Sequence, residues 1–247
     1  MLKDRLLLFV WQHVWLTVSL LIMTLGVALC IRSQLGSSVI SSIPLAFTLA
    51  GEAGLSLHLT VGEYTNLMNI ALVVLQMLIL RRRFQPVQLF QLIIGFLFGL
   101  FIDINMAVTS LFSYDSMLNC CLAQIIGCTV LGVGISMEIR CGSITMPGEG
   151  ITVAISKVSG LPFPKTKIIV DVSLVIIAVI LGYMFFGTWM EQVIGFGTLF
   201  AMLYVGFIVK CLDPHMSWFD RILGYRPGFR RYVYGLARYL RSKGIYR

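Results

Sequence analysis

The sequence predicts an all-α membrane protein with six transmembrane helices in two inverted three-helix repeats. Three observations support this prediction. Of the 247 residues, 58% are hydrophobic and 12% are charged, which leaves too few polar side chains to cover the surface of a soluble domain. Apolar runs long enough to cross a bilayer recur along the chain. Short motifs of the first half also recur in the second half, which indicates an internal repeat.

The apolar runs define the expected helices in chain order. Each is about 20 residues long, enough to cross a hydrocarbon core. They cover residues 13–32, 60–80, 86–110, 117–138, 167–187 and 191–211. Lys3 and Arg5 precede the first run as they would in a signal peptide, but no small-x-small cleavage site follows. We therefore expect the first run to be retained as a membrane span.

The repeat is visible in three pairs of short motifs. Leu25–Leu29 is echoed by Leu131–Ile135, Gly36-Ser37 by Gly142-Ser143, and Ile94-Gly95-Phe96 by Ile194-Gly195-Phe196. These pairs divide the chain into an N-terminal segment 1–12, a first unit 13–112, a linker 113–116, a second unit 117–212 and a tail 213–247. Many small-solute carriers are built from two such units.

Each unit also contains a shorter segment rich in glycine and serine, at residues 34–56 and 142–160. Pro44 interrupts the first, and Pro147 lies in the second. We expect both segments to be half-helices that re-enter the membrane or lie at its interface. Gly36-Ser37-Ser38 and Gly142-Ser143 would begin them as N-caps. A helix N-terminus inside the membrane presents free N–H groups and the positive end of a dipole.

The basic residues predict that both termini are cytoplasmic, because cytoplasmic loops collect lysine and arginine. With six spans and an inside N-terminus, all of the 19 lysines and arginines except Arg32 lie inside. An alternative with eight spans, in which the two short segments cross completely, places Arg81–Arg83 outside and loses this bias. Three spans per unit make the second unit enter from the opposite side, so the repeats are inverted.

Polar side chains at membrane depth are the best clue to a site, because they are costly there and commonly face a cavity. The candidate substrate-binding residues are Asp171, Asn69, Asp103, Glu149, Ser37 and Ser143. Asp171 and Asn69 occupy corresponding places in the two units. For Asp171 and Asp103, a helix-end charge solvated by lipid headgroups is an equally good interpretation.

Other charges near the ends of the spans are better interpreted as headgroup-solvated. These are Glu63, Glu138 and Arg32, of which the last two align at the repeat offset. Glu149 has three alternative roles inside the second half-helix: a counter-charge for a cationic substrate, a proton site, or a partner of Arg140.

The C-terminal tail predicts an amphipathic helix from residue 229 onward. Its basic residues are Arg230, Arg231, Arg238, Arg241 and Lys243, interleaved with apolar residues at helical spacing. Such a helix is expected on the anionic lipids of the inner leaflet. Nucleic-acid binding is the less favoured partner for a tail held at the membrane.

No catalytic, metal or cofactor motif is present in the sequence. His13, His58 and His215 are far apart, and the six cysteines lack zinc-like spacing. We therefore expect no enzyme, metal or cofactor. Gly95 and Gly99 form a small-xxx-small pair, for which packing within one bundle is favoured over a homo-oligomer interface.

Several motifs resemble those of a known family. They are Leu25–Leu29 with Leu35-Gly36, Gly99–Asp103, Leu131–Ile135, Cys141-Gly142, Pro147–Gly150 and Gly195–Ala201. Together they resemble the YczE/YyaS/YitT group of bacterial integral membrane proteins. The chain departs from that pattern at Ser37-Ser38-Val39, where a proline is usual, and at Glu149, where an aspartate is common. The resemblance implies a bacterial cytoplasmic-membrane protein of undefined activity.

Three classes of function remain at this level. The leading hypothesis is a small-solute transporter that binds its solute between the half-helices. The runner-up is a non-transporting scaffold or regulator that acts through its basic tail. An intramembrane enzyme acting on a lipid is third, because it needs a nucleophile or metal site that the sequence lacks.

Overall fold

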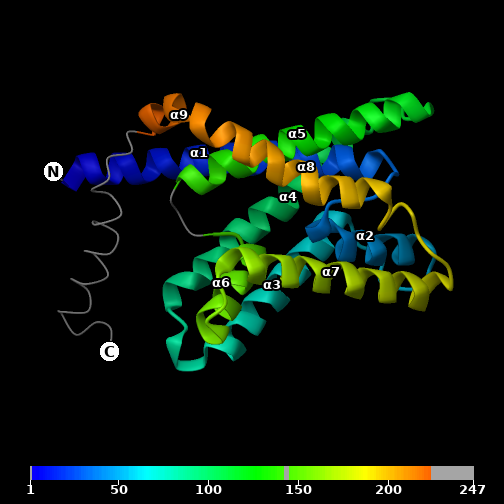
Figure 1. Cartoon of the computed structure of the whole chain (residues 1–247), viewed down its shortest axis with the longest axis horizontal. Coiled ribbons are helices and arrows are strands. Elements are labelled where there is room, and N and C mark those ends of the chain that lie inside the picture. The colour runs from blue at the N-terminus through cyan, green and yellow to red at the C-terminus, as the bar shows by residue number, and fades with distance from the viewer. Residues whose placement is uncertain (1, 142–144, 224–247) are drawn as a thin grey trace.

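The computed structural model describes residues 2–141 and 145–223, and within these ranges every regular element is helical (Figure 1). Six helices are long and apolar enough to cross a membrane. They are α1 (Leu2–Arg32), α3 (Val61–Leu80), α4 (Gln91–Thr109), α5 (Met117–Cys141), α7 (Phe163–Phe186) and α8 (Phe196–Leu212). The prediction of six membrane-spanning helices is confirmed, and the protein is a multi-pass membrane protein.

The outer surface of these helices is apolar. Large side chains such as Phe196, Leu203 and Leu78 are 85%, 79% and 65% exposed. An apolar surface of this extent is stable in lipid, where it needs no burial. The bilayer is therefore the environment that the surface fits.

Two shorter helices occupy the predicted half-helix segments. They are α2 (Val39–Glu52) and α6 (Pro147–Ser159). α2 begins after Ser38, close to the expected start. α6 begins later than expected, because Met146 is its N-cap and Gly142-Ser143 precedes it. Proline favours the first position of a helix, where its missing N–H costs nothing, and this explains the start at Pro147.

The helices form two sets of four (Figure 1). In the first set, α1 packs against α4 and α5, and α8 packs against α5. In the second set, α2 and α6 each pack against both α3 and α7. The two sets join mainly where α3 packs on α4. We refer to them as the frame set (α1, α4, α5, α8) and the half-helix set (α2, α3, α6, α7).

α1 and α5 make the closest backbone approach in the frame set. A Cβ atom added to Gly26 would lie 2.5 Å from the backbone nitrogen of Leu131 and 2.6 Å from the carbonyl oxygen of Gly127. Small residues allow this kind of approach between helices in lipid. Nearby, the Sγ atoms of Cys30 and Cys128 lie 3.7 Å apart across the same seam. Glycine is thus required at position 26 for the two central helices to touch.

The chain after α8 folds back onto the bundle. A 3-10 turn (Asp213–His215) leads into a short helix, α9 (Ser217–Ile222). The indole of Trp11 donates a hydrogen bond to the carbonyl of Ile222 (3.0 Å), and Phe219 is fully buried against Trp15. The first part of the predicted tail is therefore part of the fold. The basic residues predicted to bind lipid, from Arg230 to Lys243, lie outside the described residues.

Arg140, at the end of α5, holds this segment in place. Its guanidinium pairs with Asp213 at 2.6 Å and also with Asp220 of α9. This arrangement excludes the sequence-based suggestion that Glu149 is the partner of Arg140.

The α1–α5 seam gives a direct test of the packing. We expect Gly26→Ala to lower the free energy of unfolding by about 1–3 kcal/mol, the usual cost of overpacking a tight interface. Gly206→Ala on α8 is the matched control, because a Cβ there meets no atom within 4 Å. Melting temperatures in detergent, followed by loss of helical signal, compare the two. Equal melting temperatures for both variants would contradict the described seam.

Candidate functional site

The N-termini of the two half-helices meet inside the bundle. α1 and α5, which precede them, end at opposite ends of the molecule (Figure 1). A Cβ atom added to Gly148, in the first turn of α6, would lie 2.6 Å from Cδ1 of Ile40 in the first turn of α2. The first turns of α2 and α6 therefore approach each other inside the bundle.

Two glutamines surround the first turn of α6. Gln76 of α3 is fully buried, and its Nε2 donates to the carbonyl of Pro147 at 3.1 Å. Gln91 of α4 is 3% exposed. A Cβ atom on Gly150 would lie 2.5 Å from Oε1 of Gln91 and 2.7 Å from Oε1 of Gln76. Neither Oε1 atom has a hydrogen-bond partner. Buried acceptors without a partner are rare and call for an explanation.

Glu138, at the end of α5, is the most unusual buried group. Its side chain is 5% exposed, and neither carboxylate oxygen makes a hydrogen bond. The favourable groups around it are the backbone amide of Met146 and the ammonium of Lys167, while Glu149 repels it. The expectation that lipid headgroups solvate Glu138 is wrong, because α6 and α7 cover the end of α5 at this position.

α7 completes this cluster with an ion pair. Nζ of Lys167 lies 2.9 Å from Oδ1 of Asp171, one helical turn further on. Glu149 interacts electrostatically with both of them. We call Glu138, Glu149, Lys167 and Asp171 the charged cluster. It brings together two of the sequence-predicted residues, Asp171 and Glu149, with two that the sequence analysis did not single out for a site.

The corresponding region at the start of α2 is fully hydrogen-bonded. The hydroxyl of Ser37 donates to the carbonyl of Val193 at 2.9 Å. The amide of Gln124 on α5 accepts from Ser33 at 2.6 Å and donates to the carbonyl of Gly197 at 2.9 Å. Ser37 therefore ties the first half-helix to the segment before α8. The unsatisfied amide oxygens of Gln76 and Gln91 lie at the other half-helix, α6.

Asn69 and Asp103 lie farther along α3 and α4. Nδ2 of Asn69 donates to the carbonyl of Gly95 at 3.3 Å, and its Oδ1 has no partner. Asp103 accepts from the backbone of Gly62 at 2.9 Å and from Thr60 at 2.7 Å, which caps the start of α3. Gly62 and Gln76 are separated by 14 residues of helix, about 21 Å. The structure thus keeps Asp103 away from the charged cluster. Ser143 lies outside the described residues.

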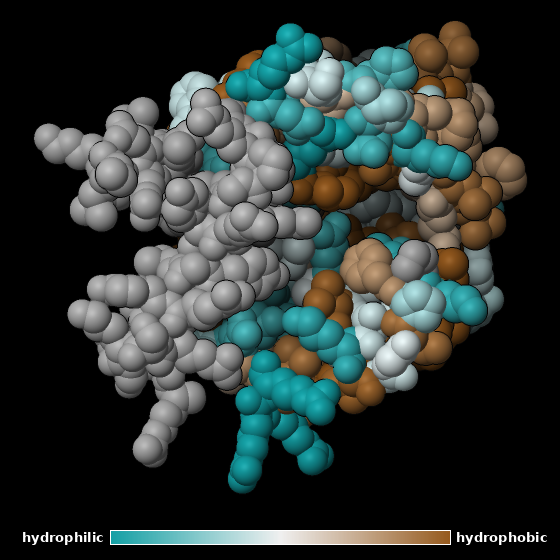
Figure 2. All heavy atoms as spheres, turned by 60° about the vertical axis from the view of Figure 1, so that its left-hand side comes forward, coloured by the Kyte–Doolittle hydropathy of each residue, from teal (hydrophilic) through white to brown (hydrophobic). Residues whose placement is uncertain are grey.

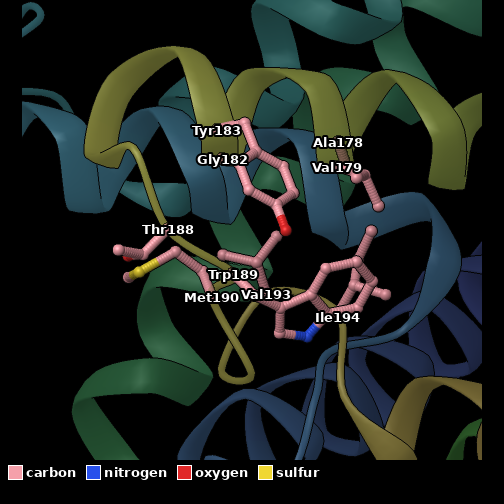
Figure 3. Close-up of a pocket in the computed structure, with 9 residues that line it drawn as sticks. All are labelled: Ala178, Val179, Gly182, Tyr183, Thr188, Trp189, Met190, Val193 and Ile194. Carbon is pink, nitrogen blue, oxygen red and sulfur yellow. The ribbon is translucent and has the colours of Figure 1, made fainter.

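A shallow depression on the outside of the bundle offers no comparable chemistry. It lies between α7 and the segment that follows it (Figure 3). The ring centroids of Tyr183 and Trp189, which both line it, are 6.3 Å apart. Met190 and Val193 add apolar surface, and no charged side chain lines it. This depression fits an apolar chain better than a polar solute.

The end of the molecule at which α1 begins is hollowed. Figure 2 shows an opening between two groups of atoms, with hydrophilic side chains around its rim and hydrophobic ones deeper in. α5 ends and α9 lies at this same end (Figure 1). Glu138 belongs to the last turn of α5, so the charged cluster lies toward this end of the bundle.

Sequence comparison places the chain in a family. A family model described as a family of unknown function (DUF6198) matches residues 10–214. The chain belongs to this family. It is also 25% identical over 204 residues to a protein of Bacillus subtilis (strain 168) described as uncharacterized protein YyaS, with 82% of this chain and 92% of that protein covered. The predicted membership in a YyaS-type family is confirmed. No solved structure matches the chain.

The residues that sequence reasoning missed carried a weak signal. Gln76 and Gln91 are long amides within or beside apolar runs, and Glu138 is an acidic residue near the end of one. The nitrogen Nη2 of Arg32, which aligns with Glu138 at the predicted repeat offset, donates to the carbonyl of Met106 at 3.0 Å.

A comparison of two glutamines tests whether the unsatisfied acceptors serve stability. Gln124→Leu removes the hydrogen bonds to Ser33 and Gly197, as well as the weaker one to the sulfur of Cys128, and should cost about 2 kcal/mol, at roughly 1 kcal/mol for each of the first two bonds. Gln91→Leu removes an amide oxygen that has no partner, so the melting temperature in detergent should stay the same or rise. A loss of stability in Gln91→Leu as large as that in Gln124→Leu would show that Gln91 is a structural residue.

Proposed function

We propose that this protein transports a small polar solute, which binds at the first turn of α6. The observation that carries the proposal is the charged cluster, in which Glu138 is buried and the other three residues are partly buried, together with the unsatisfied amide oxygens of Gln76 and Gln91 at the first turn of α6. In an apolar bundle such groups destabilise the fold unless they meet a ligand or a proton. Backbone at the start of a half-helix is a common place for a transported solute.

The pattern of helix contacts supports the two inverted units in this proposal. The proposed symmetry exchanges α1 with α5, α2 with α6, α3 with α7 and α4 with α8. Under this exchange, the contact between α1 and α4 corresponds to the contact between α5 and α8. In the same way, the contact between α2 and α7 corresponds to that between α6 and α3. The contact between α2 and α3 corresponds to that between α6 and α7. A pseudo-two-fold axis in the membrane plane, passing between α1 and α5, would produce these pairs. It would place the first turns of α2 and α6 on either side of the midplane.

The basic residues support an orientation for the transporter. Arg81, Arg82 and Arg83 form an exposed turn after α3. The positive-inside rule places this turn in the cytoplasm, and with it the N-terminus and the end of α5. The hollowed end in Figure 2 would then open toward the cytoplasm.

A ligand screen tests the proposal. At 100 times its dissociation constant, a bound solute stabilises the folded state by about 2.7 kcal/mol. We expect at least one of a set of amino acids, amines, inorganic ions and nucleosides to raise the melting temperature of the purified protein. We expect the same solute to be accumulated by proteoliposomes.

Single neutralising variants locate the binding site. Glu149→Gln and Asp171→Asn should each abolish both the thermal shift and the accumulation. Glu191→Gln, at an exposed position in the segment before α8, is the matched control and should retain both. If Glu149→Gln and Asp171→Asn both transport normally, the site is not at α6.

A scaffold acting through its C-terminal segment is the second candidate, and one observation favours it. α9 is tied to α1 and α5 by Trp11 and Arg140, which fixes the point from which the basic segment departs. A chain ending at Leu223 preserves these contacts, because Leu223 itself is fully buried. Removal of residues 224–247 should leave transport measurable under the first proposal. Under the scaffold proposal, removal of these residues should abolish the cellular function, and neither the full-length nor the shortened protein should transport a solute.

A further inference from the structure

We propose that one anionic phospholipid binds in the groove between the ends of α3 and α6, with its phosphate on Arg81, Arg82 and Arg83. This site differs from the one proposed for a solute. Gly150 and Val158 are separated by eight residues of α6, about 12 Å of helix. The lipid would bind whether or not the protein transports a solute.

The groove combines charged and apolar side chains. α3 packs against α6 (Figure 1), and the groove is lined at their ends by the three arginines and by Leu78, Ile79, Leu80 and Val158. Leu78 is 65% exposed and Val158 is 54% exposed. The apolar wall of the groove therefore faces outward from the bundle, where the bilayer surrounds it.

The three arginines have no partner within the protein. They follow one another in an exposed 3-10 turn directly after α3. Within residues 2–141 and 145–223, none of their guanidiniums makes a side-chain hydrogen bond or an ion pair, whereas Arg140 pairs with two aspartates. A guanidinium presents a planar fork of donors that matches the oxygens of a phosphate. The turn thus offers an anion several donors that no acidic side chain neutralises.

The chain on either side of the groove carries no negative charge. Neither residues 64–102 nor residues 150–170 include an aspartate or a glutamate. Lys157, exposed in the last turn of α6 and next to Val158, adds a fourth positive charge. Basic clusters directly beside a membrane helix attract the anionic lipids of the cytoplasmic leaflet. The charge of the groove therefore favours an anionic lipid over a zwitterionic one.

The backbone at Arg81 is strained. Its φ angle is +47°, in a region that residues with a side chain rarely adopt. Glycine adopts such a conformation at lower cost, so the turn alone does not explain an arginine at this position. Strained residues cluster at ligand sites, where the surrounding structure holds them in place. A bound phosphate accounts for the side chain that the strained position carries.

The apolar wall distinguishes a lipid from a soluble phosphate. A soluble anion would contact the arginines alone and leave Leu78 and Val158 without a role. A phospholipid contacts both parts, because its phosphate lies at the membrane surface and its chains extend into the bilayer. Leu78 belongs to the last turn of the membrane-spanning helix α3, and the arginines follow that helix. The order of these residues thus matches the order of the parts of a lipid.

Thermal stability of the full-length protein in detergent tests the site. Phosphatidylglycerol and phosphatidylcholine with identical chains are the probes, and only the first carries a net negative charge. We expect phosphatidylglycerol to raise the melting temperature, and native mass spectrometry to detect one bound molecule per protein. Phosphatidylcholine should do neither at the same concentration. Equal effects of the two lipids would overturn the proposal, because the arginines would then contribute nothing.

Two double variants locate the lipid. Arg82→Gln combined with Arg83→Gln should raise the phosphatidylglycerol concentration that gives half of the thermal shift by about 25-fold, at roughly fivefold for each charge near the membrane surface. Lys210→Gln combined with Arg221→Gln removes the same charge from exposed positions on α8 and α9, and should respond like the wild type. An unchanged response in the arginine pair would place the lipid elsewhere and overturn the proposal.

A further variant and a soluble probe test the contribution of the apolar wall. Leu78→Ser keeps every charge and changes an exposed position, so it should fold normally and still bind phosphatidylglycerol more weakly. Glycerol 3-phosphate, which has the phosphate without the chains, should leave the melting temperature of the wild type unchanged. A shift with glycerol 3-phosphate as large as that with the lipid, or normal lipid binding by Leu78→Ser, would show that the groove does not recognise a phospholipid.

Discussion

The structure depends on one constraint: backbone that starts a helix inside an apolar bundle must find partners other than water. The fold meets it twice, at α2 and at α6. At α2, the side chains of Ser37, Gln124 and Ser33 satisfy the groups of the turn and of the neighbouring α8. At α6, Gln76 supplies one bond to Pro147, and several acceptors remain unpaired. The polar groups around the start of α2 are therefore paired, while some of those around the start of α6 are not.

The unpaired acceptors come from helices other than α2 and α6. They are the amide oxygens of Asn66, Asn69, Gln76 and Gln91 on α3 and α4 and the two carboxylate oxygens of Glu138 on α5. Gln76 and Gln91 surround the first turn of α6. The side chains at the start of α2, in contrast, are hydrogen-bonded. The two half-helices therefore begin in different polar surroundings.

The sequence predicted the helices well and the site in part. Hydropathy located six spans and two half-helices, because lipid imposes a length and composition on each. Polar residues inside apolar runs indicated Glu149 and Asp171 as candidate site residues, and the structure places the two near each other. Glu138 was misjudged because a charge near a helix end looks the same whether headgroups or another helix cover it. Asp103 lies apart from the charged cluster because it accepts hydrogen bonds at the start of α3, which is distant in the sequence. Both placements depend on tertiary packing, which periodicity does not encode.

The division into a frame set and a half-helix set has a mechanical consequence. The backbone contact at Gly26 locks α1 to α5, so these two helices cannot slide without separating. Between the sets, by contrast, the broad contact is α3 on α4, and α7 and α8 do not pack against each other in a comparable way. The frame set and the half-helix set are therefore joined mainly along the α3–α4 interface. Gln76 on α3 and Gln91 on α4 lie on the two sides of this interface. A small rotation of the half-helix set about the interface would change the access to the first turn of α6 and leave the packing within the frame set intact.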